Sequence, residues 1–157
     1  MASMADDADA EPSPPLSLLG AQYFPTIVSS LRGVRSFVRA LAEPEFSDVT
    51  RLSDIELATS EIATNAIEHG TGTELFVSAR SSQQQFVVEI TSFGNSLEWK
   101  LDRPPLDQLS GRGLLIASTL ANSMEIVNGP GTVVVKCCFD RIRSGPGADN
   151  VNARGIR

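Results

Sequence analysis

The stretch SEIATNAIEHG, from Ser60 to Gly70, carries most of the information about the fold of this chain. It continues a pattern of apolar residues that recur every three or four positions, which predicts a helix from about residue 50 or 51 to residue 68. Gly70 is placed to end that helix. One face of it is apolar and should pack against a sheet. The positions on that face are Leu52, Ile55, Thr59, Ile62 and Ala66.

A polar edge runs beside the apolar face. Glu61, Asn65 and His69 are spaced by four residues, so they line up on one side of the helix. The side-chain oxygen of an asparagine suits Mg²⁺, and a glutamate can orient or deprotonate a hydroxyl group. The alternative is an ordinary solvent-facing edge, on which His69 caps or packs against the helix end.

The rest of the chain alternates between helical and strand patterns. A helix is expected over 26–41, with apolar positions at Val28, Leu31, Val34, Val38 and Leu41. Strands are expected over 75–80, 85–91, 123–128 and 132–139, and a short helix over 113–121. The irregular segment 92–111, which contains Pro104 and Pro105, is typical of a lid. This order predicts a two-layer α/β sandwich with a mixed, mainly antiparallel sheet.

Two glycine motifs lie close to predicted element boundaries. Gly111 and Gly113 flank Arg112 where the short helix begins, and such a backbone can cradle phosphate. Gly131-Thr132 leads into the last strand. Read alone, the first motif is explained equally well by a plain turn at the start of a helix, and the second is better explained by a hairpin turn.

In combination, these motifs resemble the nucleotide site of the histidine kinase-like (GHKL) ATPase superfamily. SEIATNAIEHG is similar to its N box, with Glu61 and Asn65 in the matching places. GRGL, which runs from Gly111 to Leu114, is similar to its G2 box, and Gly131-Thr132 is similar to its last box. The resemblance covers about residues 26–139 and implies ATP and Mg²⁺ as cofactors. The residues it implies for the site are Glu61 as the catalytic group, Asn65 as the Mg²⁺ ligand, and Ser92, Gly94, Gly111, Arg112, Gly113, Leu114 and Thr132 around the nucleotide.

The chain departs from this family at one motif. The G1 box reads Asp-x-Gly-x-Gly, whereas residues 92–96 read Ser92-Phe93-Gly94-Asn95-Ser96. A serine hydroxyl accepts hydrogen bonds but lacks the charge-assisted bond of an aspartate, which contributes about 1.5–3 kcal/mol. The resemblance therefore implies ATP binding that is weaker or altered.

The stretch LRGVRSFVRAL, Leu31 to Leu41, is similar to the first helix of the anti-sigma-factor serine kinases. That likeness implies a kinase that phosphorylates an anti-anti-sigma (STAS) protein, sequesters a sigma factor and forms a homodimer. The alternative is a pseudokinase-type module that acts by protein contact alone. A third interpretation is an α/β domain of unrelated function.

Composition narrows the class of protein. The 157 residues suit one domain, and a net charge of −6 argues against nucleic acid or an anionic membrane as a partner. Cys137 and Cys138 are adjacent and are interpreted as packing residues of a reduced cytoplasm. We expect an acidic, disordered start over 1–16, the ATP-binding domain over 17–140 and a flexible tail over 141–157. No secretory signal or membrane span is expected.

Overall fold

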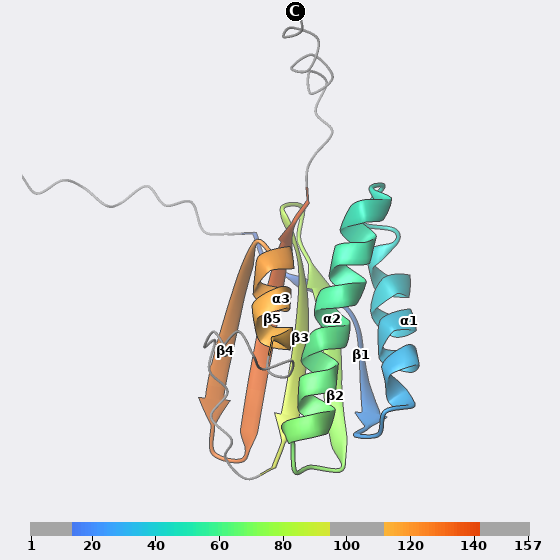
Figure 1. Cartoon of the computed structure of the whole chain (residues 1–157). Coiled ribbons are helices and arrows are strands. Elements are labelled where there is room, and N and C mark those ends of the chain that lie inside the picture. The colour runs from blue at the N-terminus through green and yellow to red at the C-terminus, as the bar shows by residue number, and fades with distance from the viewer. Residues whose placement is uncertain (1–13, 95–111, 142–157) are drawn as a thin grey trace, which may run out of the picture.

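The computed structural model describes residues 14–94 and 112–141. In this part of the chain, one five-stranded antiparallel sheet carries three helices on one face (Figure 1). The strand order is β1-β2-β3-β5-β4. The two-layer α/β sandwich is therefore confirmed, with every described strand pair antiparallel. The elements are β1 Ser17–Pro25, α1 Ser30–Ala42, α2 Val49–His69, β2 Glu74–Ser81, β3 Gln85–Phe93, α3 Gly113–Leu120, β4 Ser123–Gly129 and β5 Thr132–Asp140.

Helix α2 packs on the sheet as its apolar spacing predicts. All five positions of the predicted stripe, from Leu52 to Ala66, are buried. The Asp48 side chain accepts a hydrogen bond from the Thr50 N–H and so caps the start of the helix. At the other end, Gly70 adopts extended backbone angles and stops it.

The central strands show why the core lies between the sheet and the helices. Burial along β5 alternates strictly from Thr132 to Phe139, so one side of the strand faces the helices. Two pairs of aromatic rings pack at the side of the core that lies near α1. Phe24 meets Phe37 at 5.8 Å between ring centroids, and Phe46 meets Phe86 at 5.6 Å.

The sequence patterns missed the first strand. Strand β1 was not expected because a register shift between Leu18 and Gly20 breaks the alternation on which strand prediction depends. The predicted start of the first helix, at residue 26, is wrong by four residues. Thr26 instead donates its N–H to Thr73 O and its hydroxyl to Gly72 O, which holds it outside the helix. Val28 is consequently 73% exposed and not part of the apolar stripe.

The described part of the chain begins and ends at the upper end of the sheet in Figure 1. The last described residue, Arg141, donates its backbone N–H to Gln84 O, and its guanidinium contacts Ser82 O and Glu45. The expected disordered start and flexible tail lie almost wholly outside the described residues, and these boundaries stay predictions. Among the described helices, none is long and apolar enough to span a membrane.

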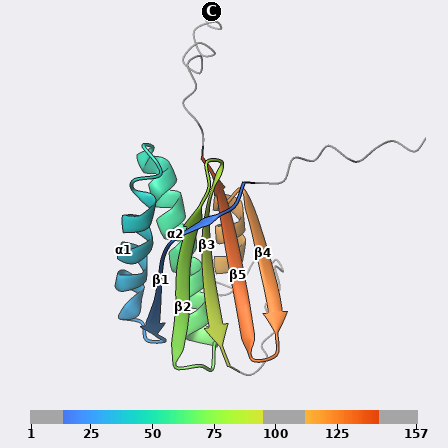
Figure 2. The same ribbon diagram turned by 180° about the vertical axis from the view of Figure 1, so that it is seen from behind.

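The far face of the sheet carries no helix in the described part of the chain (Figure 2). The start of β1 passes across its upper end, where Val87 is buried. Lower down, Tyr23 and Val127 are 55% and 50% exposed. This side is called the open face below.

Candidate functional site

The polar edge of α2 lies beside the stripe that packs on the sheet. Glu61 and Asn65 are both half-buried, one turn apart. Neither side chain has a hydrogen-bond or ion-pair partner among the described residues. His69, by contrast, is exposed, and its imidazole lies 3.9 Å from the Glu68 carboxylate at the end of the helix. The structure therefore separates Glu61 and Asn65, which border the interior, from His69, which does not.

The start of α3 meets this edge directly. A Cβ placed on Gly113 would lie 2.8 Å from Glu61 Oε2 and 3.4 Å from Glu61 O. Only a glycine lets the helix begin so close to that carboxylate. The G2-like motif and the N-box-like motif, which are about fifty residues apart in the chain, are thus brought into contact. Arg112 is the N-cap residue of α3, and Leu114 is buried beneath it.

A second pair of motifs meets at the lower end of the sheet. The Gly94 N–H donates a hydrogen bond of 3.0 Å to Gly131 O, which joins the end of β3 to the β4–β5 turn. Both glycines have positive φ, +136° and +75°. A side chain on Gly94 would also overlap the Thr71 hydroxyl. These glycines therefore allow the end of β3, the β4–β5 turn and the chain that follows α2 to approach closely.

Ser92 lies on the helix-facing side of β3. It is 6% exposed, and its hydroxyl oxygen has no hydrogen-bond partner among the described residues. An unpaired buried polar atom costs about 1–3 kcal/mol, so it is expected where a ligand completes the bond. Ser92 pairs with Val133, and Phe93 pairs with Thr132. Since side chains alternate, Thr132 points to the open face while Val133 shares the face of Ser92.

The structure therefore places one pair of predicted site residues in contact, Glu61 and Gly113. Asn65 lies one turn further along α2, and Ser92 and Gly94 lie at the end of β3 and directly after it. The Thr132 side chain points to the other face of the sheet. The predicted residues Gly111, Asn95, Ser96, Pro104 and Pro105 lie outside the described residues.

Two buried residues that lie near the helices were not identified from the sequence. Thr59 is 1% exposed with an unpaired hydroxyl, although its place in an apolar stripe made it look like a packing residue. Val133 is adjacent to Ser92, and only the strand register places it there. A polar residue within an otherwise apolar stripe is the signal that could have identified Thr59.

The residues present fit a bound nucleotide with Mg²⁺. The unpaired Ser92 hydroxyl can accept or donate a hydrogen bond to a base, and the glycine-bordered start of α3 can receive phosphate. In the described residues, no cluster of three or more His, Cys, Asp or Glu side chains could hold a metal ion. Asn65 together with phosphate oxygens could hold a magnesium ion.

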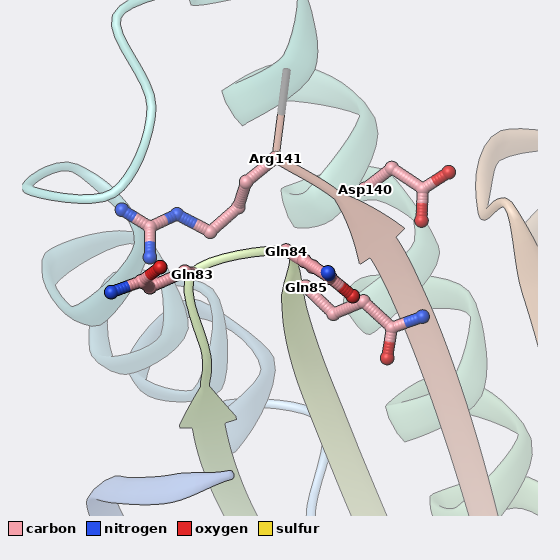
Figure 3. A pocket seen from close by; sticks show the side chains of 5 residues that line it. All are labelled: Gln83, Gln84, Gln85, Asp140 and Arg141. Atoms are coloured by element: carbon pink, nitrogen blue, oxygen red, sulfur yellow. The ribbon is translucent and has the colours of Figure 1, made fainter. Parts of the chain in front are cut away.

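One open pocket lies elsewhere. It has a volume of about 400 Å³ and is formed by the β2–β3 turn and the end of β5, at the opposite end of the sheet from Gly94 (Figure 3). Its lining residues are Gln83, Gln84, Gln85, Asp140 and Arg141. Because Arg141 is already engaged by Ser82 and Glu45, this pocket offers no uncommitted charge of its own for a phosphate.

Comparison with protein families agrees with this arrangement of motifs. The family model described as "Histidine kinase-like ATPase domain" matches residues 24–138, which is well over half of the chain. The chain belongs to this family of ATPase domains. Domains of this class bind ATP, usually with Mg²⁺. No curated protein sequence matches the chain.

A solved structure with low sequence identity shares the fold. The RsbU and RsbW domains of Rv1364c from Mycobacterium tuberculosis align with a TM-score of 0.58 and 20% identity. That alignment covers 76% of this chain and 32% of the other, so the chain spans about a third of that protein's structure. The histidine kinase AdeS of Acinetobacter baumannii aligns with a TM-score of 0.46 and 15% identity, covering 78% and 68% of the two chains.

Proposed function

We propose that this chain is a cytoplasmic ATP-binding anti-sigma factor that phosphorylates a serine or threonine of an anti-anti-sigma (STAS) protein. The observation that carries the proposal is the contact between the start of α3 at Gly113 and Glu61, with Asn65 one turn further along α2. The likeness to a structure that contains an RsbW domain supports the choice of subgroup. A sigma factor is the second proposed partner.

The roles of the residues follow from their positions. Asn65 would supply its side-chain oxygen to Mg²⁺, and the backbone of Arg112 and Gly113 would hold phosphate at the helix start. Bound Mg-ATP would supply the phosphoryl group. Glu61 would orient the hydroxyl of the partner and accept its proton, a contribution typically of 10²–10⁴-fold.

The second candidate is a pseudokinase that binds partners without phosphoryl transfer. It is favoured by Ser92, a neutral side chain where the family carries an aspartate. Glu61 and Asn65 argue against the pseudokinase. A module that acts only by binding a partner does not need both of these polar side chains on the same edge of α2. The two candidates differ in chemistry and not in fold.

Transfer of labelled phosphate from ATP to a STAS protein tests the proposal. Glu61→Gln keeps the size of the side chain and removes the base. We expect nearly unchanged ATP affinity and transfer reduced at least a hundredfold. Glu68→Gln, an exposed glutamate two turns further along α2, is the matched control and should retain full transfer. Wild-type protein that binds its partner but never transfers phosphate would leave only the pseudokinase.

A homodimer is the proposed assembly, and the open face suggests where it forms. Strand register places a row of side chains across this face, in the order Tyr23, Phe76, Thr91, Val134, Val127. The Tyr23 ring lies 4.8 Å from the Phe76 ring, between centroids. Large side chains therefore fill one half of the row and small ones the other.

This row is complementary to itself when a two-fold axis runs along β3 through Thr91. Phe76 of one copy then meets Val134 of the other, and Tyr23 meets Val127. The next row contains the Glu89–Lys136 ion pair, 3.4 Å between its charged atoms. Glu89 of each copy then lies on the axis and Lys136 one strand away from it, so two charges of each sign meet there. Three rows of side chains across the five strands are uncovered on the open face. From the strand spacing and the rise per residue, each copy would bury about 500 Å² of this face in the dimer. A total of about 1,000 Å² is the lower limit for a specific interface, so the expected dimer dissociates readily.

A further inference from the structure

Arg51 has an unusual location for a basic side chain. It lies in the first turn of α2, where the helix dipole disfavours a positive charge. Its side chain is nevertheless only 21% exposed. Its nearest carboxylate, Asp54 on the same helix, is 3.9 Å away and hence at the limit of an ion pair. The reason for its position must therefore lie in what its guanidinium contacts beyond α2.

Both hydrogen bonds of the guanidinium are made at the far end of α3. One guanidinium nitrogen donates a hydrogen bond of 3.2 Å to Leu120 O, a carbonyl that has no partner within its own helix. The other donates to the Asn122 side-chain oxygen. The guanidinium carbon also lies 5.2 Å from the centre of the Phe139 ring on β5. A cation at a helix C-terminus is favourable, so Arg51 stabilises α3 from outside.

Asn122 extends this contact into the sheet. Its side-chain oxygen also accepts the Asp140 N–H at 2.9 Å, and its own N–H donates to Cys138 O at 2.9 Å. The end of α3 is therefore fixed to α2 and to β5 at once. The planar guanidinium presents two donors in a fixed fork to Leu120 and Asn122 while it lies over the Phe139 ring, a combination that the compact ammonium of a lysine reproduces only in part.

Helices α2 and α3 run antiparallel, so the two ends of α3 meet α2 at different places. The C-terminal end of α3 is held by Arg51, and the N-terminal end of α3, at Gly113, contacts Glu61. Eight helical residues form a rod about 12 Å long, and a shift at one end displaces the other. We propose that Arg51 is a positioning residue that sets the start of α3 against Glu61 and thereby the affinity for the phosphates of ATP. This rests on the proposed nucleotide site.

Titration calorimetry with ATP and with adenosine tests this role. In Arg51→Ala we expect ATP affinity to fall about tenfold while adenosine affinity stays within twofold, because only phosphate reaches the start of α3. Asn122→Ala should show the same split. Arg39→Ala is the matched control, since Arg39 joins α1 to Glu56 of α2 at 2.7 Å without touching α3. It should leave both affinities unchanged.

Hydrogen exchange of the α3 amides from Ile116 to Leu120 provides a reading that needs no ligand. Exchange should accelerate at least tenfold in Arg51→Ala and not in Arg39→Ala. If Arg51→Ala does not fold, Arg51→Lys replaces it, and it should show the same changes at smaller size. Unchanged ATP affinity, equal losses for ATP and adenosine, or unchanged α3 exchange would overturn the assignment. If the wild-type protein binds no nucleotide, the proposed function is refuted instead. Hydrogen exchange of the α3 amides would then be the measurement that decides whether Arg51 positions α3.

Discussion

Glu61 and Gly113 are in such close contact that a single added methyl group on the glycine would reach the carboxylate, 2.8 Å from Oε2. The atom that must move is the far end of a flexible side chain, so the fold can accommodate the change while the carboxylate is displaced. This makes Gly113 a position at which stability and chemistry can be separated.

Gly113→Ala should leave the free energy of unfolding within about 1 kcal/mol of wild type, since alanine is the better helix former. Phosphoryl transfer should fall at least tenfold because Glu61 is displaced. Urea unfolding and the transfer assay measure the two effects. Gly33→Ala on α1 is the control, with its Cβ at an ordinary 3.4 Å from Phe24 Cε1. Full activity of Gly113→Ala would show that the position of Glu61 is not critical.

Asn65→Ala should abolish the Mg²⁺ dependence of ATP binding. The half-buried side chain borders the site without filling the core, so thermal unfolding should be nearly unchanged. ATP affinity is measured by calorimetry with Mg²⁺ and with a chelator, and the mutant should give the same value in both. Thr64→Ala, its half-buried neighbour, should keep the wild-type response. A mutant that still gains affinity from Mg²⁺ would remove Asn65 from the metal site.

Substitutions of Ser92 should move stability and affinity in opposite directions. Ser92→Ala removes an unpaired buried hydroxyl and should raise the free energy of unfolding by about 1 kcal/mol, while ATP affinity falls. Ser92→Asp buries a carboxylate and should destabilise the free protein, yet tighten ATP binding about tenfold through a charge-assisted bond. Calorimetry and urea unfolding of both variants test this. Weaker ATP binding by the aspartate variant would mean that this pocket recognises another ligand.

Cys137 should be unreactive until the protein unfolds. Burial raises the pKa of its thiol to about 12 from an ordinary value of 9.0, with the neighbouring Cys138 adding to the shift. As the pH rises above about 9, the unfolded chain loses this proton first, so stability should fall by about 1.4 kcal/mol per pH unit. At about pH 8, a thiol reagent should label Cys138 alone. Cys137→Ala should flatten the alkaline loss of stability, and Cys138→Ala should not.

The sequence predicted the parts of the fold that depend on local periodicity. The stripe of α2 follows from spacing alone, and both this stripe and the strand expected over 132–139 were found. Strand β1 was missed because its bulge interrupts the alternation at Gly20. The contact of Glu61 with Gly113 was implied only by family resemblance, since nothing in the spacing relates residues so far apart. The direction of the Thr132 side chain required the strand register.

The assembly of two copies through the open face gives the most specific geometric prediction. With the two-fold axis along β3, Tyr23 of one copy faces Val127 of the other. Two Tyr23 residues are then about four strand spacings apart, or about 19 Å. Packed sheets lie about 10 Å apart, which a short bis-maleimide can bridge. All variants carry Cys138→Ser, because Cys138 is only half-buried.

Mixing Tyr23→Cys with Val127→Cys protein should give a cross-linked dimer, whereas Tyr23→Cys alone should not. Thr91→Cys, on the axis, should cross-link with itself, and Glu43→Cys on the exposed end of α1 should not. Sedimentation should show concentration-dependent dimers that Phe76→Asp abolishes, because a carboxylate would be buried against Val134. If Tyr23→Cys cross-links with itself, the axis instead crosses the strands, and large side chains meet large ones. If no variant cross-links and the protein sediments as a monomer at all concentrations, the open face does not bind a second copy.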